Sequence, residues 1–293
     1  SSHRGSARFP FRGRVSRTGC AAADVKLRLK KIPRPGSPAR KSGRANRNET
    51  SKMLNSAVES FSGLRCQTVD GLKPGTAATK LVVLSHGFGA PGDDLVGLAA
   101  FLIRSSETVA ATCRFVFPEA PIDLTPMGMP GGRAWWPINM AKLAEINQTG
   151  DYDELTKLLP DGMLKASQQL FDALREMQTQ CGLDDSATVL GGFSQGAMLG
   201  TDVVLRHGVV PQNLVLFSGT VLCSAEWQQF AAEHPGCPVL QSHGRQDMVL
   251  PFPPAESLRD LLGRNGFVVR FCPFDGPHTI PEEVLIELAR MLS

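Results

Sequence analysis

The sequence predicts an α/β fold in which helices cover both faces of a mostly parallel sheet. Segments of strand type alternate with segments of helix type along most of the chain, which is the order that such a sheet requires. The run Leu81-Val82-Val83-Leu84 is apolar at every position, as expected for a parallel strand that is buried on both faces. A chain of 293 residues, 42% of them hydrophobic, can form one such domain with an appendage.

The elements follow from apolar runs and the turn residues around them. Strands are predicted at residues 80–85, 114–117, 187–191, 213–217, 238–242 and 267–272, with a less certain strand at 63–69. Helices are predicted at residues 94–104, 161–181, 195–207, 225–233, 254–265 and 281–291. We therefore expect a single doubly wound domain over residues 61–293.

An insertion at about residues 118–160 interrupts this alternation. It opens with a loop rich in Pro, Gly and Met at 118–132, continues with Arg133-Ala134-Trp135-Trp136-Pro137, and ends in two short helical pieces at 138–147 and 152–159. Long insertions in compact domains commonly serve as lids or binding loops. We interpret this one as a helical cap over the site, in which Trp135 and Trp136 either line a substrate pocket or anchor the cap to the body.

The first 60 residues form a basic tail. Residues 1–52 hold 15 Lys and Arg against 2 Asp and Glu, whereas the rest of the chain holds 16 and 26. Such a composition favours disorder and also suits a targeting peptide. The tail has no aromatic or folded module for nucleic acid, so we expect no nucleic-acid partner. Oligomeric state has no signal in the sequence.

The composition also indicates the cellular compartment in which we expect the protein. No run approaches the 18 or more apolar residues of a transmembrane helix. The seven cysteines are odd in number and widely spread without a CxxC pair, which argues against a zinc site and against a disulfide framework. We expect buried, reduced cysteines, no metal, and an intracellular location, either cytoplasmic or in an organelle if the tail is a transit peptide.

The most informative motif is Gly192-Phe193-Ser194-Gln195-Gly196, which lies between a predicted strand and a predicted helix. This context is typical of a nucleophile elbow, a sharp turn that lifts a serine hydroxyl above the edge of the sheet. Ser194 is therefore the candidate nucleophile. Because a serine hydroxyl is a poor nucleophile until a base accepts its proton, the elbow also requires a base and an acid.

In hydrolases of the elbow type the partners follow in the order Ser, acid, His. His278, in the loop after the last strand, is the histidine that follows every plausible acid and is the candidate base. Asp247 lies just beyond the strand before it, at the sheet edge where catalytic groups gather, and is the candidate acid. Asp275 is the alternative acid, and Asp247 could instead serve only as a turn-forming residue.

Two backbone donors are expected for the developing oxyanion. The N–H of Gln195, directly after the nucleophile, is the first. The second is the N–H of Phe88 in the loop His86-Gly87-Phe88-Gly89, which follows an early strand. We expect His86 to hold this loop rather than to act as a second base, and we expect the side chains of Phe88 and Gln195 to have no role.

Four motifs together resemble the phospholipase/carboxylesterase branch of the α/β-hydrolase superfamily, which includes acyl-protein thioesterases. They are the His86–Gly89 loop, the elbow continued by Ala197, His243-Gly244 followed by Asp247, and Gly276-Pro277-His278, and the resemblance covers roughly residues 78–292. It implies an α/β-hydrolase fold and cofactor-free hydrolysis of esters or thioesters. The run at 133–137 and the insertion after it look like esterases with an enlarged cap more than like the compact thioesterases.

From the residues and this resemblance, the chain is predicted to be a serine carboxylic ester hydrolase that forms an acyl-enzyme on a small ester or acyl substrate. Acyl-protein thioesterase or lysophospholipase activity is the second hypothesis. A hydrolase-fold binding protein without catalysis is the third. The triad does not define the acyl chain or the alcohol, because pocket shape sets both.

Overall fold

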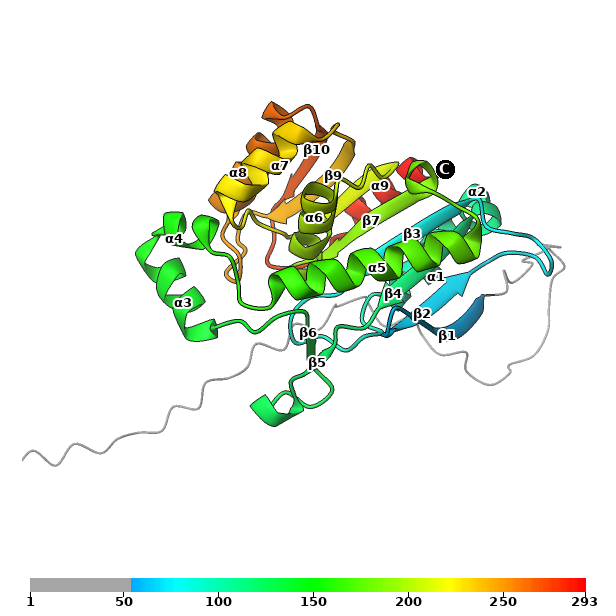
Figure 1. Cartoon of the computed structure of the whole chain (residues 1–293), viewed down its shortest axis with the longest axis horizontal. Coiled ribbons are helices and arrows are strands. Elements are labelled where there is room, and N and C mark those ends of the chain that lie inside the picture. Colours follow the sequence, from blue (N-terminus) through cyan, green and yellow to red (C-terminus); the bar gives the residue numbers. More distant parts are fainter. Residues whose placement is uncertain (1–53) are drawn as a thin grey trace, which may run out of the picture.

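The computed structural model describes residues 54–293, and the predictions for residues 1–53 lie outside this range. Its main feature is an eight-stranded sheet in the order β1-β2-β4-β3-β7-β8-β9-β10 (Figure 1). Strand β2 pairs antiparallel with both β1 and β4, and every other neighbouring pair is parallel. The sheet is thus mostly parallel with an antiparallel edge.

All seven predicted strands are present; two have the predicted bounds, and the ends of the others differ by one or two residues. The strands are β1 (Asn55–Phe61), β2 (Leu64–Asp70), β3 (Lys80–Ser85), β4 (Cys113–Pro118), β7 (Thr188–Phe193), β8 (Asn213–Phe217), β9 (Pro238–Gly244) and β10 (Val268–Phe274). Strand β1 was not predicted. Its side chains are mostly exposed and only Phe61 is buried, so it lacks the apolar run that marks a central strand. The ordered sheet therefore starts at Asn55, inside the segment assigned to the tail.

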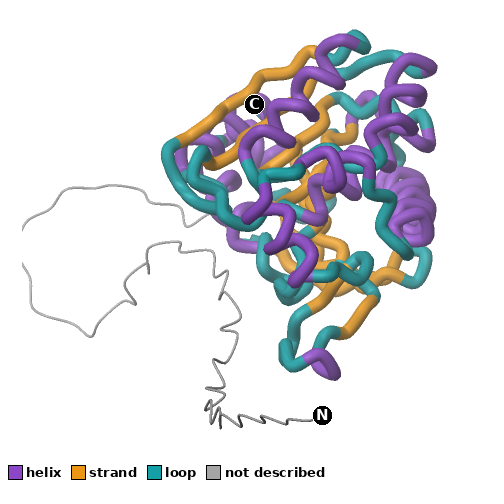
Figure 2. The backbone as a smooth tube through the Cα atoms, turned by 90° about the vertical axis from the view of Figure 1, so that its left-hand side faces the viewer, coloured by secondary structure: helices purple, strands orange, loops and turns teal. Residues whose placement is uncertain are grey.

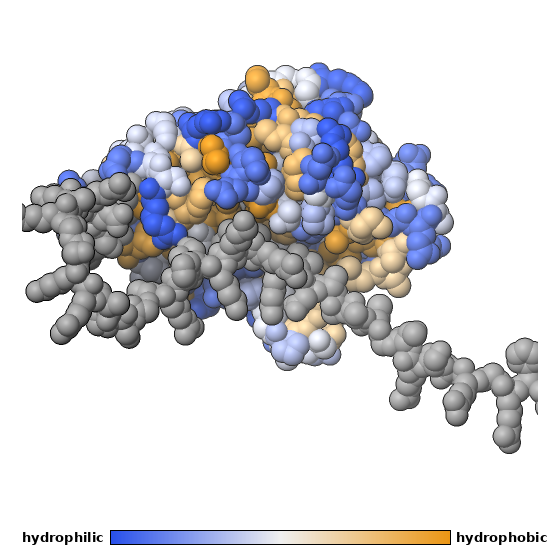
Figure 3. All heavy atoms as spheres, turned by 180° about the vertical axis from the view of Figure 1, so that it is seen from behind, coloured by the Kyte–Doolittle hydropathy of each residue, from blue (hydrophilic) through white to orange (hydrophobic). Residues whose placement is uncertain are grey.

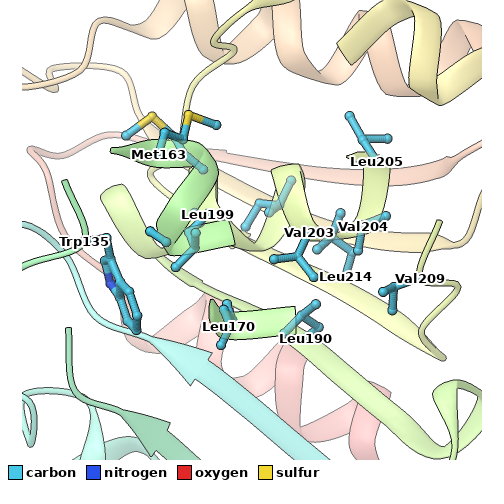
Figure 4. Close-up of a cluster of buried hydrophobic side chains, with 14 of the residues drawn as sticks. Trp135, Met163, Leu170, Leu190, Leu199, Val203, Val204, Leu205, Val209 and Leu214 are labelled. Atoms are coloured by element: carbon cyan, nitrogen blue, oxygen red, sulfur yellow. The ribbon is translucent and has the colours of Figure 1, made fainter. Parts of the chain in front are cut away.

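Helices cover both faces of the sheet, as predicted (Figure 2). One face carries α5 (Met163–Cys181), α6 (Gln195–His207), α7 (Ser224–Glu233) and α8 (Phe252–Arg264). The other carries α1 (Val96–Ser105), α2 (Glu107–Thr112) and α9 (Glu282–Leu292). Each face has its own cluster of buried side chains, and Figure 4 shows part of the first, where Leu170, Leu190 and Leu199 meet. This is the α/β-hydrolase fold.

Helix α2 is the helix that the sequence did not predict. It has only six residues, too few to display a helical period, and it begins where the Ser106 hydroxyl accepts the Val109 N–H.

Seen from behind, the outer surface mixes hydrophilic and apolar side chains (Figure 3). No helix within residues 54–293 is long and apolar enough to cross a membrane.

The insertion consists of a small hairpin and two helices. Strands β5 (Ile122–Asp123) and β6 (Arg133–Ala134) pair antiparallel, with the 3-10 helix η1 (Thr125–Met127) between them, and this hairpin projects from the body (Figure 1). Helices α3 (Met140–Thr149) and α4 (Tyr152–Lys157) follow, close to the predicted pieces. Trp135 and Trp136 are almost fully buried between the hairpin and α5, so they anchor the insertion to the core.

Candidate active site

The candidate residues gather at the carboxyl edge of the parallel strands. The loop His86–Gly89 follows β3, Ser194 follows β7, Asp247 lies beyond β9 and His278 lies beyond β10. In open α/β sheets this edge is where ligands and reacting groups collect. The strand order places β3, β7, β8, β9 and β10 next to one another, so loops that are far apart in the sequence meet at one place.

Ser194 occupies a strained turn between β7 and α6. Its φ is +54° and its ψ is −116°, a conformation that a residue with a side chain rarely adopts and that costs of order 1–3 kcal/mol. Close packing maintains the turn, since a Cβ on Gly192 or Gly196 would lie 2.1 or 2.0 Å from the Ser85 carbonyl oxygen. The two glycines let the turn lie directly against the end of β3, as a nucleophile elbow requires.

The candidate acid and base are hydrogen bonded. His278 Nδ1 donates to Asp247 Oδ2 at 2.6 Å, and both side chains are nearly inaccessible to solvent. With Nδ1 protonated toward the carboxylate, Nε2 is left to accept a proton, the tautomer that a general base needs. The two loops pack tightly, since a Cβ on Gly244 would lie 2.3 Å from the Gly276 carbonyl oxygen.

Asp247 also shapes its own loop. Its Oδ1 accepts the N–H groups of Val249 at 2.8 Å and Leu250 at 2.9 Å. The turn-forming role and the pairing with His278 therefore belong to different oxygens of the same carboxylate. The alternative acid, Asp275, has a side chain that is 84% exposed and pairs with Arg245, so it does not contact the base.

A second histidine, His243 at the end of β9, contacts the same carboxylate. Its Nε2 donates to the Leu250 carbonyl oxygen at 2.7 Å and lies 3.3 Å from Asp247 Oδ2. Burial lowers the pKa of His243 from its usual value, because an apolar surrounding disfavours the charged imidazolium. A neutral His243 thus holds the acid loop closed. Its position directly after a strand, four residues before Asp247, was the available sequence signal.

The base lies beside the elbow. The His278 ring lies 4.7 Å, centroid to centroid, from the ring of Phe193, the residue before the nucleophile. Ser218, which follows β8 and has a φ of +50°, donates its hydroxyl to the Thr279 carbonyl oxygen and so holds the His278 loop. Within residues 54–293, Ser194 Oγ makes no hydrogen bond, and the serine keeps 8% of its surface exposed. The structure thus brings Asp247 and His278 together beside the elbow that carries Ser194.

The loop predicted to supply the second oxyanion donor lies against the nucleophile. A Cβ on Gly87 would meet Ser194 Cβ at 3.2 Å. Among the described residues, the backbone N–H groups of Phe88 and Gln195 donate to no protein acceptor, while the next N–H of the loop, that of Gly89, donates to the Arg133 carbonyl oxygen. The two predicted donors thus remain available to a bound oxyanion.

Both ring nitrogens of His86 are used in structural hydrogen bonds. Its Nδ1 donates to the Gly87 carbonyl oxygen at 2.8 Å, and its Nε2 accepts the Ala120 N–H at 3.1 Å. Burial lowers the pKa of His86 to about 4, so the ring is neutral near pH 7. Both ring nitrogens are occupied, which leaves no nitrogen for proton transfer.

The side chain of Gln195 has contacts that the sequence analysis did not expect. Its Oε1 accepts the Trp135 N–H at 2.9 Å, and its Nε2 donates to the Trp136 carbonyl oxygen at 2.9 Å. The Trp135 indole N–H donates to the His86 carbonyl oxygen at 3.0 Å. Trp135 and Trp136 are only 2% and 1% exposed, so in this structure they offer almost no surface to a ligand, and a role in a substrate pocket stays a prediction.

The insertion also reaches the site from the acid side. The Asn147 amide of α3 donates to the carbonyl oxygens of Met248 and Val249 beside the candidate acid, each at 3.1 Å. Arg133 instead contacts residues of the insertion itself: it donates to the Ala120 carbonyl oxygen and lies 3.4 Å from Glu119. The cap therefore contacts both the elbow side and the acid side.

Two surface grooves lie away from these residues. One, of about 450 Å³, is lined by residues 72–78 with Arg114 and Cys181. The other, of about 500 Å³, lies between α4, α7 and α8. No candidate catalytic residue lines either groove. Within the part of the chain that the structure describes, no group of His, Cys, Asp and Glu side chains is arranged to hold a metal ion.

Comparisons with protein families and with known proteins indicate which family the chain resembles. The Phospholipase/Carboxylesterase family matches residues 72–293. The chain is 30% identical to an acyl-protein thioesterase 1 of Eremothecium gossypii over 211 residues, which cover 69% of this chain and 82% of that protein. An acyl-protein thioesterase 1 of Candida albicans is 24% identical over 225 residues, covering 74% and 93% of the two chains.

Solved structures share the fold. The crystal structure of esterase PE8 superposes with a TM-score of 0.62 at 28% identity and covers 82% of this chain and 97% of that one. A carboxylesterase from Mesorhizobium loti superposes with a TM-score of 0.61 at 20% identity and covers 81% and 98%. The second likeness, at its low identity, concerns the fold alone.

Proposed function

Since the chain belongs to the phospholipase/carboxylesterase family, we propose that it hydrolyses carboxylic esters or thioesters through an acyl-enzyme on Ser194. The observation that carries the proposal is the Asp247–His278 hydrogen bond beside a strained serine whose hydroxyl has no partner among residues 54–293. An acid, a base and a nucleophile in this order and geometry serve acyl transfer.

In the first half-reaction Ser194 Oγ attacks the acyl carbonyl carbon while His278 Nε2 accepts the hydroxyl proton. Asp247 keeps the imidazole in the required tautomer and stabilises the imidazolium. The carbonyl oxygen becomes an oxyanion that accepts the N–H groups of Phe88 and Gln195. As the tetrahedral intermediate collapses, the bond to the leaving alcohol or thiol breaks and His278 returns the proton to it.

In the second half-reaction water replaces the leaving group. His278 accepts a proton from water, the hydroxide attacks the acyl-enzyme carbonyl, and the same two N–H groups hold the new oxyanion. Collapse releases the carboxylic acid and restores Ser194 with the proton from His278. Water is the sole co-reactant of the two half-reactions.

A thioester substrate is the second candidate. The observation in its favour is the likeness to proteins named acyl-protein thioesterase 1. Likeness to a structure named an esterase favours oxygen esters. A pair of peptides with the same acyl chain, one linked through cysteine and the other through serine, separates the two: a preference for the cysteine peptide at every acyl length would support the thioesterase, and no cleavage of it would exclude that function.

The test of the catalytic assignment is Ser194→Ala. We expect kcat for p-nitrophenyl esters, measured over acyl lengths from acetyl to palmitoyl, to fall on the order of 10⁴-fold or more. Labelling by a fluorophosphonate probe should be lost in the same variant. Ser105→Ala is the matched control, because that hydroxyl is exposed and donates only to the Phe101 carbonyl oxygen of its own helix, α1.

Unchanged turnover in Ser194→Ala would overturn the assignment. Absence of both turnover and labelling in the unmodified protein would support the third hypothesis, a hydrolase-fold binding protein.

A further inference from the structure

The two expected oxyanion donors are joined by one buried segment of the insertion, residues 133–136, which we call the brace. We propose that the Gln195 side chain and the brace position the two donors relative to each other, which makes Gln195 a positioning residue as well as a backbone donor. The proposal rests on the proposed function, since it concerns the oxyanion site of that reaction.

The brace holds the Phe88 loop on both sides. After Phe88, the Gly89 N–H donates to the Arg133 carbonyl oxygen at 2.9 Å, and the Arg133 N–H donates to the Ala90 carbonyl oxygen at 3.0 Å. Before Phe88, the His86 carbonyl oxygen accepts the indole N–H of Trp135 at 3.0 Å. Because bonds flank the loop on both sides, the direction of the Phe88 N–H depends on where the brace lies.

Gln195 holds the other end of the brace. Its amide makes two bonds of 2.9 Å with the Trp135 N–H and the Trp136 carbonyl oxygen, and the Gln195 residue is fully buried. A buried amide without these partners would leave polar groups unpaired, which is unfavourable. The backbone N–H of the same residue is the first donor, so a single residue carries one donor and fixes the support of the other.

The position of such donors affects rate more than ground-state binding. Donors act when they lie 2.7–3.1 Å from the place that the oxyanion will occupy, and removal of one donor typically reduces kcat by about 10²–10³. A donor that is displaced, and not removed, should therefore reduce kcat by a smaller factor. A residue that merely stabilises the fold would instead lower the amount of folded enzyme and leave the kcat of the folded fraction unchanged.

The test is Gln195→Met, which keeps the length of the side chain and removes both hydrogen bonds. The matched control is Gln178→Met: that amide is also buried and bonded, to Asp185 and Thr188, but at the opposite end of β7. The measurements are thermal unfolding and the kcat and KM of enzyme quantified by fluorophosphonate labelling. Affinity for a trifluoromethyl ketone, whose adduct with Ser194 places an oxyanion in the site, is the fourth.

We expect Gln195→Met to lower kcat about 10- to 100-fold with KM changed less than threefold, a loss below that of a whole donor. Binding of the ketone should weaken by a factor similar to the fall in kcat/KM. Gln178→Met should lower the unfolding temperature and keep kcat. A kcat of Gln195→Met equal to that of the control, or a rise in KM with kcat unchanged, would overturn the proposal.

A second variant covers the case in which Gln195→Met does not fold. Trp135→Phe keeps an aromatic ring in the core and removes only the indole N–H bond to the His86 carbonyl oxygen. We expect a smaller fall in kcat, again with KM preserved. Where both variants fold, their combined effect should differ from the product of the single effects, because the two bonds act through the same brace. Strictly independent effects would contradict the proposal.

Failure of this proposal is distinct from failure of the proposed function. If Ser194→Ala abolishes activity while Gln195→Met and Trp135→Phe retain the unmodified kcat, the proposed serine hydrolase activity is supported and the positioning role of Gln195 is refuted. If Ser194→Ala keeps its activity, the proposed function itself fails.

Discussion

The nucleophile side and the acid side of the site are held by different kinds of interaction. Within residues 54–293, the Ser194 side chain makes no hydrogen bond, and the residue lies in a strained turn that is maintained by backbone packing against β3. Asp247 has both carboxylate oxygens bonded, one to its own loop and one to His278. The proposed nucleophile is thus positioned by backbone packing, and the proposed acid is positioned by hydrogen bonds. Substitutions on the two sides should therefore affect activity and stability differently.

Among substitutions that keep Ser194, the largest expected effect is on the acid side, in Asp247→Asn. The Asn Oδ1 can still accept the N–H groups of Val249 and Leu250, but the NH₂ group meets His278 Nδ1 and favours the wrong tautomer. We expect kcat to fall about 10³- to 10⁴-fold, with the unfolding midpoint in urea moved only slightly. A small loss of kcat would show that His278 obtains its orientation elsewhere, for example from the Ser218 contact.

On the nucleophile side the corresponding change is Gly196→Ala. The new Cβ would lie 2.0 Å from the Ser85 carbonyl oxygen, and backbone cannot yield as a flexible side chain does. Overpacking of this kind costs about 1–3 kcal/mol or more, so we expect a lower free energy of unfolding together with loss of activity, read from urea unfolding and ester hydrolysis.

Gly263→Ala is the matched control for that substitution. This glycine lies within α8 and nothing lies within 4 Å of its added Cβ. We expect it to stabilise the protein by up to about 1 kcal/mol, since alanine favours a helix, with activity unchanged. Equal unfolding free energies for the two variants would refute the steric account of the elbow.

A smaller effect on the nucleophile side concerns the pH dependence of stability. His86, beside the nucleophile, has a folded pKa of about 4 against a usual 6.5. Between these values the unfolded chain binds a proton that the folded protein does not, so stability falls as the pH decreases. The slope from this residue is at most about 1.4 kcal/mol per pH unit. We expect His86→Gln to flatten the pH dependence of the unfolding free energy from pH 6.5 to 4, and an unchanged slope would contradict a neutral buried His86.

Local patterns were sufficient to predict most of the sheet and the Asp247–His278 pair that lies at its carboxyl edge; the triad itself stays a prediction. The elbow is a contiguous motif, and the order of acids and histidines after Ser194 left one base and one favoured acid. The role of the Gln195 side chain could not be predicted, because its partners, Trp135 and Trp136, belong to an insertion whose docking depends on tertiary packing. The contact between His243 and Asp247 was not predicted either, because it forms only when the loop after β9 closes.

Strand β1 has a practical consequence for anyone who trims this protein. The predicted boundary at residue 60 falls near the end of β1, and a chain that begins there would leave the hydrogen-bonding groups of β2 along Leu64–Asp70 without their neighbour. It would also remove Glu59, which pairs with Arg114 and Gln180. An uncovered strand of this kind recruits other chains, so a cut a few residues too late would expose β2 as a new sheet edge and favour aggregation.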